Sequence, residues 1–137
     1  AGLSFIKPYF SSGDVKIKGT FIIGTVFGDM HDIGKNLVAM MVEGSGYKVI
    51  DLGIDCSVDK YEKALDENPD AIVGLSALLT TTMTNMKTII DTIHSKHPST
   101  KFIVGGAPVT SEFAAQIGAT YGKDPQDVVE KLDRLVG

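Results

Sequence analysis

A histidine between two carboxylates is the strongest chemical feature of this sequence. The run Asp29-x-His31-Asp32 places one imidazole among acids, and neutral imidazole is a common ligand for borderline transition metals. A ligating histidine normally hydrogen bonds an oxygen through its second ring nitrogen, and Asp29 is the natural candidate. One histidine without converging cysteines cannot supply the ligand set that zinc requires, so a metal already held by a macrocycle fits this loop better.

Alternating structural elements are expected to position this histidine. Short apolar runs predict strands at 21–26, 47–52, 71–75, 101–104 and 119–121. Segments of helical periodicity predict helices at about 33–43, from Ser57 to before Asn68, through 83–93, at 111–117 and at 125–135. In the first helix, the apolar stripe expected to face the core is Ile33, Leu37, Met40 and Met41. In the third helix, the expected buried stripe is Met83, Met86, Ile89, Ile90 and Ile93.

The alternation predicts an α/β fold, a flavodoxin-like (Rossmann-like) parallel sheet of five strands with helices on both faces. Right-handed crossovers favour the strand order 2-1-3-4-5, in which ligands bind at the carboxyl ends of strands one and three. The loop after strand one contains His31, and the loop after strand three begins at Ser76. Both loops are therefore expected at one ligand-binding edge.

Composition limits the class of partner. The 137 residues suit one domain, and the net charge of −4 without a basic block argues against nucleic acid. The single Cys56 cannot form an intrachain disulfide. No apolar stretch approaches the roughly 20 residues needed to span a bilayer. We therefore expect a cytoplasmic domain with neither nucleic acid nor membrane as its partner.

Three spaced motifs carry a resemblance to a known family. They are Asp29-x-His31-x-x-Gly34, then Ser76-x-Leu78, then Gly105-Gly106, with 41 residues between the first two motifs and 26 between the last two. Over residues 20–136 this pattern resembles the cobalamin-binding domain of methyltransferase-associated corrinoid proteins, of the methylamine, methoxyl-compound and methionine synthase type. The residues that continue the first and third motifs favour methyl transfer over radical rearrangement.

The resemblance implies a cofactor and a set of contacts. Cobalamin, as methylcobalamin, hydroxocobalamin or cob(I)alamin, would bind with its base displaced and with His31 as the protein ligand to cobalt. Asp29 and Ser76 would form a hydrogen-bonded relay behind that histidine. The implied cofactor contacts are Gly28, Asp29, Met30, His31, Asp32, Ile33, Gly34, Ser76, Leu78, Thr80, Gly105, Gly106, Ala107, Tyr121 and Asp124.

The resemblance also implies a role and partners. The chain would be a non-catalytic corrinoid subunit that shuttles a methyl group, through Co(I) and methyl-Co(III), between two methyltransferases. One would be specific for the substrate, the other would pass the methyl group to an acceptor such as tetrahydrofolate or a thiol, and a reductive activase would be a further partner.

Such proteins usually carry an N-terminal helical cap, which this sequence begins too late to contain. We expect residues 1–19 to be a linker or a remnant of that cap, and residues 20–137 to be the cobalamin-binding domain. Two other hypotheses remain open. One is the cobalamin-binding domain of an adenosylcobalamin mutase or of a B12-dependent regulator. The other is a flavodoxin-like regulatory domain without cobalamin.

Overall fold

Strands and helices alternate along the chain in the computed structural model, which describes residues 17–136. The elements are β1 (Thr20–Thr25), α2 (Ile33–Gly44), β2 (Lys48–Asp51), α3 (Val58–Glu67), β3 (Ile72–Ser76), α4 (Thr80–Met83), α5 (Asn85–Lys96), β4 (Phe102–Gly105), α6 (Ser111–Gln116), β5 (Thr120–Tyr121) and α7 (Pro125–Val136). Each strand lies within one residue of its predicted bounds. Most of the predicted linker, residues 1–16, lies outside the described part of the chain.

The strands form one parallel sheet in the order β2-β1-β3-β4-β5, which confirms the predicted topology. The register aligns the carboxyl ends of the three central strands, because Thr25 pairs with Ser76 and Ser76 pairs with Gly105. The loops that follow these strands therefore emerge side by side at one edge of the sheet. This edge holds all three motifs singled out from the sequence.

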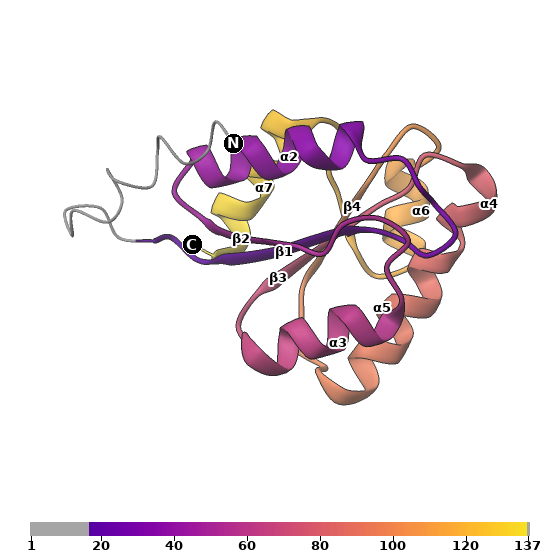
Figure 1. The fold of residues 1–137 in the computed structure, drawn as a ribbon, viewed down its shortest axis with the longest axis horizontal. Coiled ribbons are helices and arrows are strands. Elements are labelled where there is room, and N and C mark those ends of the chain that lie inside the picture. The colour runs from indigo at the N-terminus through magenta and orange to yellow at the C-terminus, as the bar shows by residue number, and fades with distance from the viewer. Residues whose placement is uncertain (1–16, 137) are drawn as a thin grey trace.

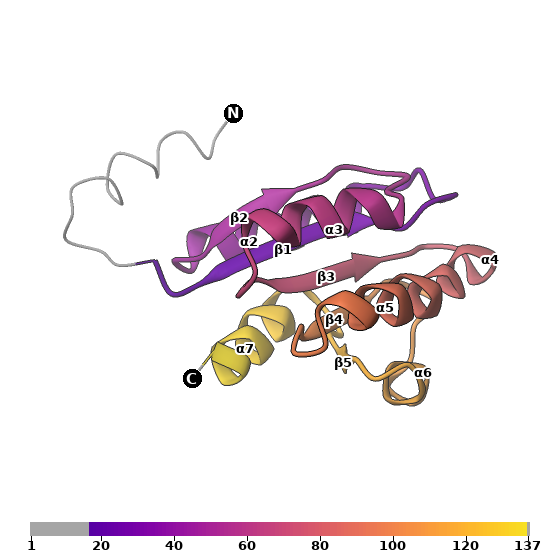
Figure 2. The same cartoon turned by 90° about the horizontal axis from the view of Figure 1, so that it is seen from below.

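Helices cover both faces of the sheet. Figure 1 shows α2 and α7 on one face and α3 and α5 on the other, and Figure 2 shows the same layers after a quarter turn. The two faces bury separate apolar clusters, one under α2 and α7 and one under α3, α5 and α6. Such layered burial is what a parallel sheet requires of its crossover helices. No helix among residues 17–136 is long and apolar enough to cross a membrane.

The buried face of α2 differs from the prediction. The expected core stripe is exposed, with exposed fractions of 77% for Ile33, 50% for Leu37, 52% for Met40 and 42% for Met41. The helix instead buries Lys35, Ala39 and Val42, with Val38 partly buried against the same cluster. Both sets of residues recur at helical spacing, so periodicity alone could not choose between the two faces. The prediction of the stripe was wrong.

The third helical segment is divided in two. A short helix, α4, covers the end of the loop after β3, and α5 follows from Asn85 after a break at Thr84. The predicted apolar stripe of this segment is confirmed in α5, where Met86, Ile89, Ile90 and Ile93 are fully buried.

A buried tyrosine links β2 to the C-terminal helix. The Tyr47 hydroxyl, on a side chain that is almost fully buried, donates a 2.6 Å hydrogen bond to Asp133 Oδ1 in α7. This hydrogen bond is the main cause that lowers the pKa of Asp133 below the ordinary 3.8. The contact therefore stabilises the fold at pH values above the ordinary pKa of 3.8. This contribution is lost as the pH falls through the lowered pKa of Asp133.

Tyr47→Phe is expected to lower the free energy of unfolding by about 1 kcal/mol at neutral pH, because one buried hydrogen bond is lost. The difference from wild type should shrink in acid below about pH 4. Urea denaturation at pH 7 and pH 3 measures both values. Asp91→Asn, which removes the exposed ion pair of Asp91 with Lys87 on α5, serves as the control and should change stability by less than about 0.5 kcal/mol. A loss that is equal at both pH values would contradict the assignment to Asp133.

Candidate functional site

The buried carboxylate of Asp29 organises the carboxyl edge of the sheet. Its side chain is fully buried in the loop after β1. One oxygen, Oδ2, accepts hydrogen bonds from Leu78 N at 2.8 Å and from Thr82 Oγ1 at 2.6 Å. The other, Oδ1, accepts from the backbone N of His31 at 3.1 Å. Asp29 therefore ties the loop after β1 to the loop and helix that follow β3.

The His31 ring lies against this carboxylate. His31 Nδ1 is 2.8 Å from Asp29 Oδ1, and half of the His31 side chain is exposed. The backbone carbonyl of His31 accepts a 3.0 Å hydrogen bond from Thr25 Oγ1, which fixes the residue to the end of β1. A hydrogen bond from Nδ1–H to a carboxylate selects the tautomer in which Nε2 is unprotonated, so its lone pair is available to a metal. The geometry therefore presents Nε2 as a ligand atom.

Hydrogen bonding keeps Asp29 ionised. Burial alone raises the pKa of this carboxyl, but hydrogen bonds from Thr82, Leu78 and His31 outweigh burial and hold the pKa far below its ordinary 3.8. A carboxylate that receives several hydrogen bonds is stabilised in its charged form. At any physiological pH the His31 ring therefore faces a negative charge.

The predicted relay needs one correction. Within residues 17–136 Ser76 makes no hydrogen bond to Asp29, and the hydroxyl in that place belongs to Thr82. Thr82 is buried, and its Oγ1 also lies 3.0 Å from Leu79 O, an alternative acceptor for the same hydroxyl proton. Thr82 is the last of three consecutive threonines, and Thr80, which is predicted as a cofactor contact, is exposed at the start of α4. The phase of α4 decides which threonine points inward, and no sequence signal fixed it.

A groove of about 360 Å³ opens beside this cluster, between α2 and α7 on one face of the sheet. Its floor comes from the central strands, including Ile23, Gly74 and Ile103. Its walls come from α2 and α7. Seven of the sequence-predicted contacts line it: Gly34, Ser76, Gly105, Gly106, Ala107, Tyr121 and Asp124. Ser76 thus faces the groove rather than the relay.

Two glycines shape the end of this groove. Gly106 has a φ of 126°, and a Cβ there would overlap the carbonyl oxygen of Ala77. A Cβ at Gly105 would lie 2.8 Å from the carbonyl oxygen of Gly122. Backbone segments from two neighbouring loops therefore pack directly on this pair. The close approach requires glycine for the fold itself, in addition to leaving room in the groove.

The remaining predicted contacts surround His31 at the surface. Met30, Ile33 and Leu78 have exposed fractions of 62%, 77% and 45%, so they form an apolar rim at the carboxyl edge. Asp32 precedes α2 without a side-chain cap. Two other predicted contacts make hydrogen bonds within the protein. Asp124 Oδ1 accepts one from Asp127 N at 2.8 Å, and Gly28 N donates one to Asp55 Oδ1 in the loop after β2.

A buried lysine beside the groove was missed by sequence reasoning. Lys35 is only 3% exposed, and its Nζ lies 2.8 Å from both carboxylate oxygens of Asp51 at the end of β2. The same Nζ donates to Asn36 Oδ1 at 2.6 Å. These hydrogen bonds hold the first turn of α2 against the sheet through Lys35, while the apolar side chains of Ile33 and Leu37 lie on the exposed side of the helix. Nothing in the sequence pattern distinguished Lys35 from an exposed lysine.

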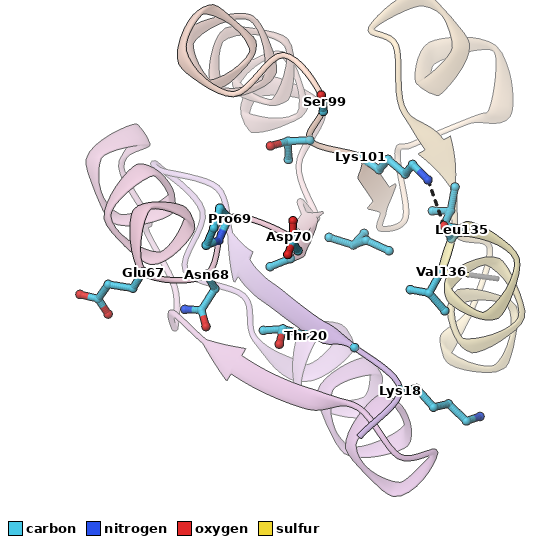
Figure 3. A pocket seen from close by; sticks show the side chains of 14 residues that line it. Lys18, Thr20, Glu67, Asn68, Pro69, Asp70, Ser99, Lys101, Leu135 and Val136 are labelled. Atoms are coloured by element: carbon cyan, nitrogen blue, oxygen red, sulfur yellow. Dashed lines mark hydrogen bonds between the residues drawn. The ribbon is translucent and has the colours of Figure 1, made fainter. Parts of the chain in front are cut away.

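The described residues bring together no group of three His, Cys, Asp or Glu side chains that could hold a metal ion. His31 is thus a single candidate ligand. Another cavity, of about 610 Å³, lies at the opposite, amino edge of the sheet, and Figure 3 shows its lining by Lys18, Pro69, Lys101 and Val136. None of the predicted site residues lines that cavity. The predicted site residues therefore lie away from this cavity.

Several known proteins have sequences similar to this chain. The family described as B12 binding domain matches residues 19–130. The chain is 38% identical over 142 residues to a corrinoid protein of Desulfitobacterium hafniense strain Y51, covering 99% of this chain and 66% of that protein. It is 42% identical over 137 residues to trimethylamine corrinoid protein 1 of Methanosarcina acetivorans, covering 96% of this chain and 63% of that protein.

A solved structure agrees with the fold. A chain of the methanol:cobalamin methyltransferase complex MtaBC from Methanosarcina barkeri superimposes with a TM-score of 0.85 and 32% identity, over 93% of this chain and 50% of that one. The chain thus spans just under two thirds of the curated relatives named above and half of this structural neighbour.

Proposed function

Because this chain belongs to the B12-binding domain family, with cobalamin as its cofactor, we propose that it is the methyl-carrying domain of a corrinoid-dependent methyltransferase system. The observation that carries the proposal is the Asp29–His31 pair, in which a buried carboxylate holds a half-exposed imidazole at 2.8 Å. The relatives named for trimethylamine support methyl carriage over the mutase and regulator hypotheses.

The residues present fit the cofactor on two counts. The corrin supplies its own equatorial ligands, so one exposed imidazole nitrogen is the contribution that the protein needs to make, and His31 offers it. The displaced nucleotide tail needs a slot beside the sheet, and the groove between α2 and α7 has the volume of a small-molecule site. A Cβ at Gly34 would meet nothing within 4 Å, so this glycine leaves the surface beside His31 open to a flat ligand.

Each residue has a defined task in this proposal. Bound cobalamin supplies a cobalt centre that accepts and releases a methyl group. His31 would bind that centre through Nε2, and Asp29 would fix the ring and raise the basicity of the ligating nitrogen. Thr82 and the backbone of Leu78 keep Asp29 ionised and oriented. The chain needs no nucleophile or general base of its own.

The partners follow from the same proposal. The apolar side chains of Met30, Ile33 and Leu78 are exposed at the same edge of the sheet as His31, so they would offer apolar contacts to a bound corrin. We infer that a substrate-specific methyltransferase and a second methyltransferase, acting on tetrahydrofolate or a thiol, reach the bound cofactor in turn. A reductive activase would restore the carrier after accidental oxidation.

The test is reconstitution of the 137-residue chain with hydroxocobalamin and methylcobalamin. Wild type should bind both forms with its base displaced and with the absorption spectrum of histidine ligation. His31→Ala should remove that spectral signature and weaken binding by about 10- to 100-fold, because a metal contact is lost. Absorption titration and electron paramagnetic resonance of the Co(II) form, in which a histidine nitrogen splits the signal, measure both effects.

The matched control is His97→Ala, at the end of α5, where the imidazole hydrogen bonds Asp66 at 3.0 Å. It should leave the spectrum and the affinity unchanged. If wild type binds neither form, the proposed carrier function fails. If His31→Ala binds with an unchanged spectrum, ligation by His31 is wrong.

A further inference from the structure

We propose that Asp55, in the loop between β2 and α3, is a positioning residue that orients the Asp29–His31 pair through hydrogen bonds to the backbone of Gly28 and Asp29. The inference rests on the proposed ligation by His31 and deepens it. Asp55 lies 26 residues from Asp29 in the sequence, and no pattern in the sequence connected the two residues.

Asp55 contacts the histidine loop at two points. Its Oδ1 accepts a 2.6 Å hydrogen bond from Gly28 N, and its own backbone N donates a 3.0 Å hydrogen bond to Asp29 O. These two contacts bracket the residues Gly28 and Asp29 from the same side. Asp55 thereby supplies two of the hydrogen bonds that hold the backbone from which the Asp29 carboxylate projects toward His31.

The backbone of Asp55 is itself held in an uncommon conformation. Its φ is 50°, and no other non-glycine residue in the described range 17–136 has a positive φ. Aspartate and asparagine are the side chains that best tolerate this left-handed region, and such a conformation persists where surrounding contacts enforce it. Here it lets the backbone N and the carboxylate of Asp55 reach the same loop. The positive φ of Asp55 is therefore the conformation that allows its two contacts with the loop to form together.

One other contact reaches the middle of the loop, where Asp29 N donates a 3.1 Å hydrogen bond to Val26 O. Two side-chain contacts hold the ends of the loop. Asn85 Nδ2 donates to Phe27 O at 2.7 Å, and Thr25 Oγ1 donates to His31 O at 3.0 Å. Neither reaches the backbone of Gly28 or Asp29. Loss of the Asp55 carboxylate should therefore leave the loop attached and the core intact, because Asp55 is exposed and lies outside both apolar clusters. We expect the loss of this carboxylate to change the orientation of the Asp29–His31 pair and to make the pair more mobile.

The test compares Asp55→Gly with Asp55→Asn. Glycine accepts the positive φ without strain but has no acceptor, whereas asparagine tolerates that φ and keeps an oxygen at the position of Oδ1. Asp70→Gly, the same exchange in the turn before β3 at the amino edge, is the matched control. Urea denaturation of all variants verifies that they are folded.

The first readout needs no cofactor. In the apo protein, Asp55→Gly should accelerate hydrogen exchange at Gly28 N by about tenfold, the loss expected for a hydrogen bond to a charged group. It should also move the His31 ring ¹⁵N shifts toward the average of the two tautomers. Asp55→Asn and Asp70→Gly should stay within about twofold of wild type. Unchanged Gly28 exchange and His31 shifts in Asp55→Gly would overturn the proposal, as would equal losses in Asp55→Asn.

The second readout is the histidine-ligated fraction after reconstitution with hydroxocobalamin. Asp55→Gly should lower the ratio of ligated to unligated cofactor by about tenfold, with Asp55→Asn restoring it. An unchanged ratio would overturn the positioning role. If instead the wild-type spectrum proves insensitive to His31→Ala, the proposed ligation fails by itself, and the apo measurements still decide whether Asp55 positions the pair.

Discussion

Gly106→Ala is expected to cost about 4 kcal/mol or more of folding free energy and to abolish cobalamin binding. The added Cβ would overlap the carbonyl oxygen of Ala77 and would lie 2.9 Å from its carbonyl carbon. Both are backbone atoms, and Ala77 N is held by a 3.2 Å hydrogen bond to Gly105 O, so a rotamer change cannot relieve the overlap. The φ of 126° adds backbone strain for any L side chain.

The matched control is Gly118→Ala, in the loop after α6. Gly118 also has a positive φ, of 77°, but a Cβ there meets nothing within 4 Å. This variant should lose only about 1 kcal/mol, the cost of the left-handed backbone alone. Urea denaturation followed by circular dichroism measures both losses. Similar losses in the two variants would show that contact with Ala77 does not explain the requirement for glycine at 106.

Asp29→Ala is expected to lower the free energy of unfolding by about 3 to 5 kcal/mol. The substitution removes an acceptor from a fully buried position. It leaves Leu78 N and His31 Nδ1 without this partner and Thr82 Oγ1 with Leu79 O alone. Unsatisfied buried donors cost more than the net value of the hydrogen bonds that they made. The His31 ring also loses the contact that selects its tautomer, so histidine ligation should fall with stability.

Asp32→Ala provides the comparison for this variant. Asp32 is exposed in the same loop and makes no side-chain hydrogen bond at the start of α2. Its replacement should change stability by less than about 0.5 kcal/mol. Chemical denaturation together with the ¹⁵N shifts of His31 distinguishes the two aspartates. A loss below about 1 kcal/mol for Asp29→Ala would mean that the loop rearranges to satisfy the three donors.

Much of the fold could be predicted because its signals are local. Apolar β-rich runs, helical periodicity and turn residues located every strand within one residue, and the crossover rule supplied the strand order. The face of α2 could not be predicted in the same way. Val38, Ala39 and Val42 form as regular a stripe as Leu37 and Met41 do, and the face that is buried also carries Lys35, which pairs with Asp51 from a distant part of the sequence.

The residues of the candidate site likewise include some that local sequence predicts and some that depend on the folded structure. Asp29 and His31 are two residues apart, so their contact could be predicted from spacing and the needs of an imidazole ligand. Thr82 and Asp55 reach the same pair from other loops. Their contributions depend on the phase of a four-residue helix and on a left-handed backbone angle, which no pattern of residue types encodes.

The contacts of Asp29 join segments that are 49 and 53 residues apart in the sequence, through Leu78 and Thr82. The imidazole is consequently oriented by folding, before any cofactor arrives. Binding then does not have to freeze a loop or a rotamer, and that conformational entropy has already been lost. Affinity for the corrin should accordingly depend on how rigid this edge of the apo protein is, and changes that loosen it should act mainly on the rate at which the cofactor leaves.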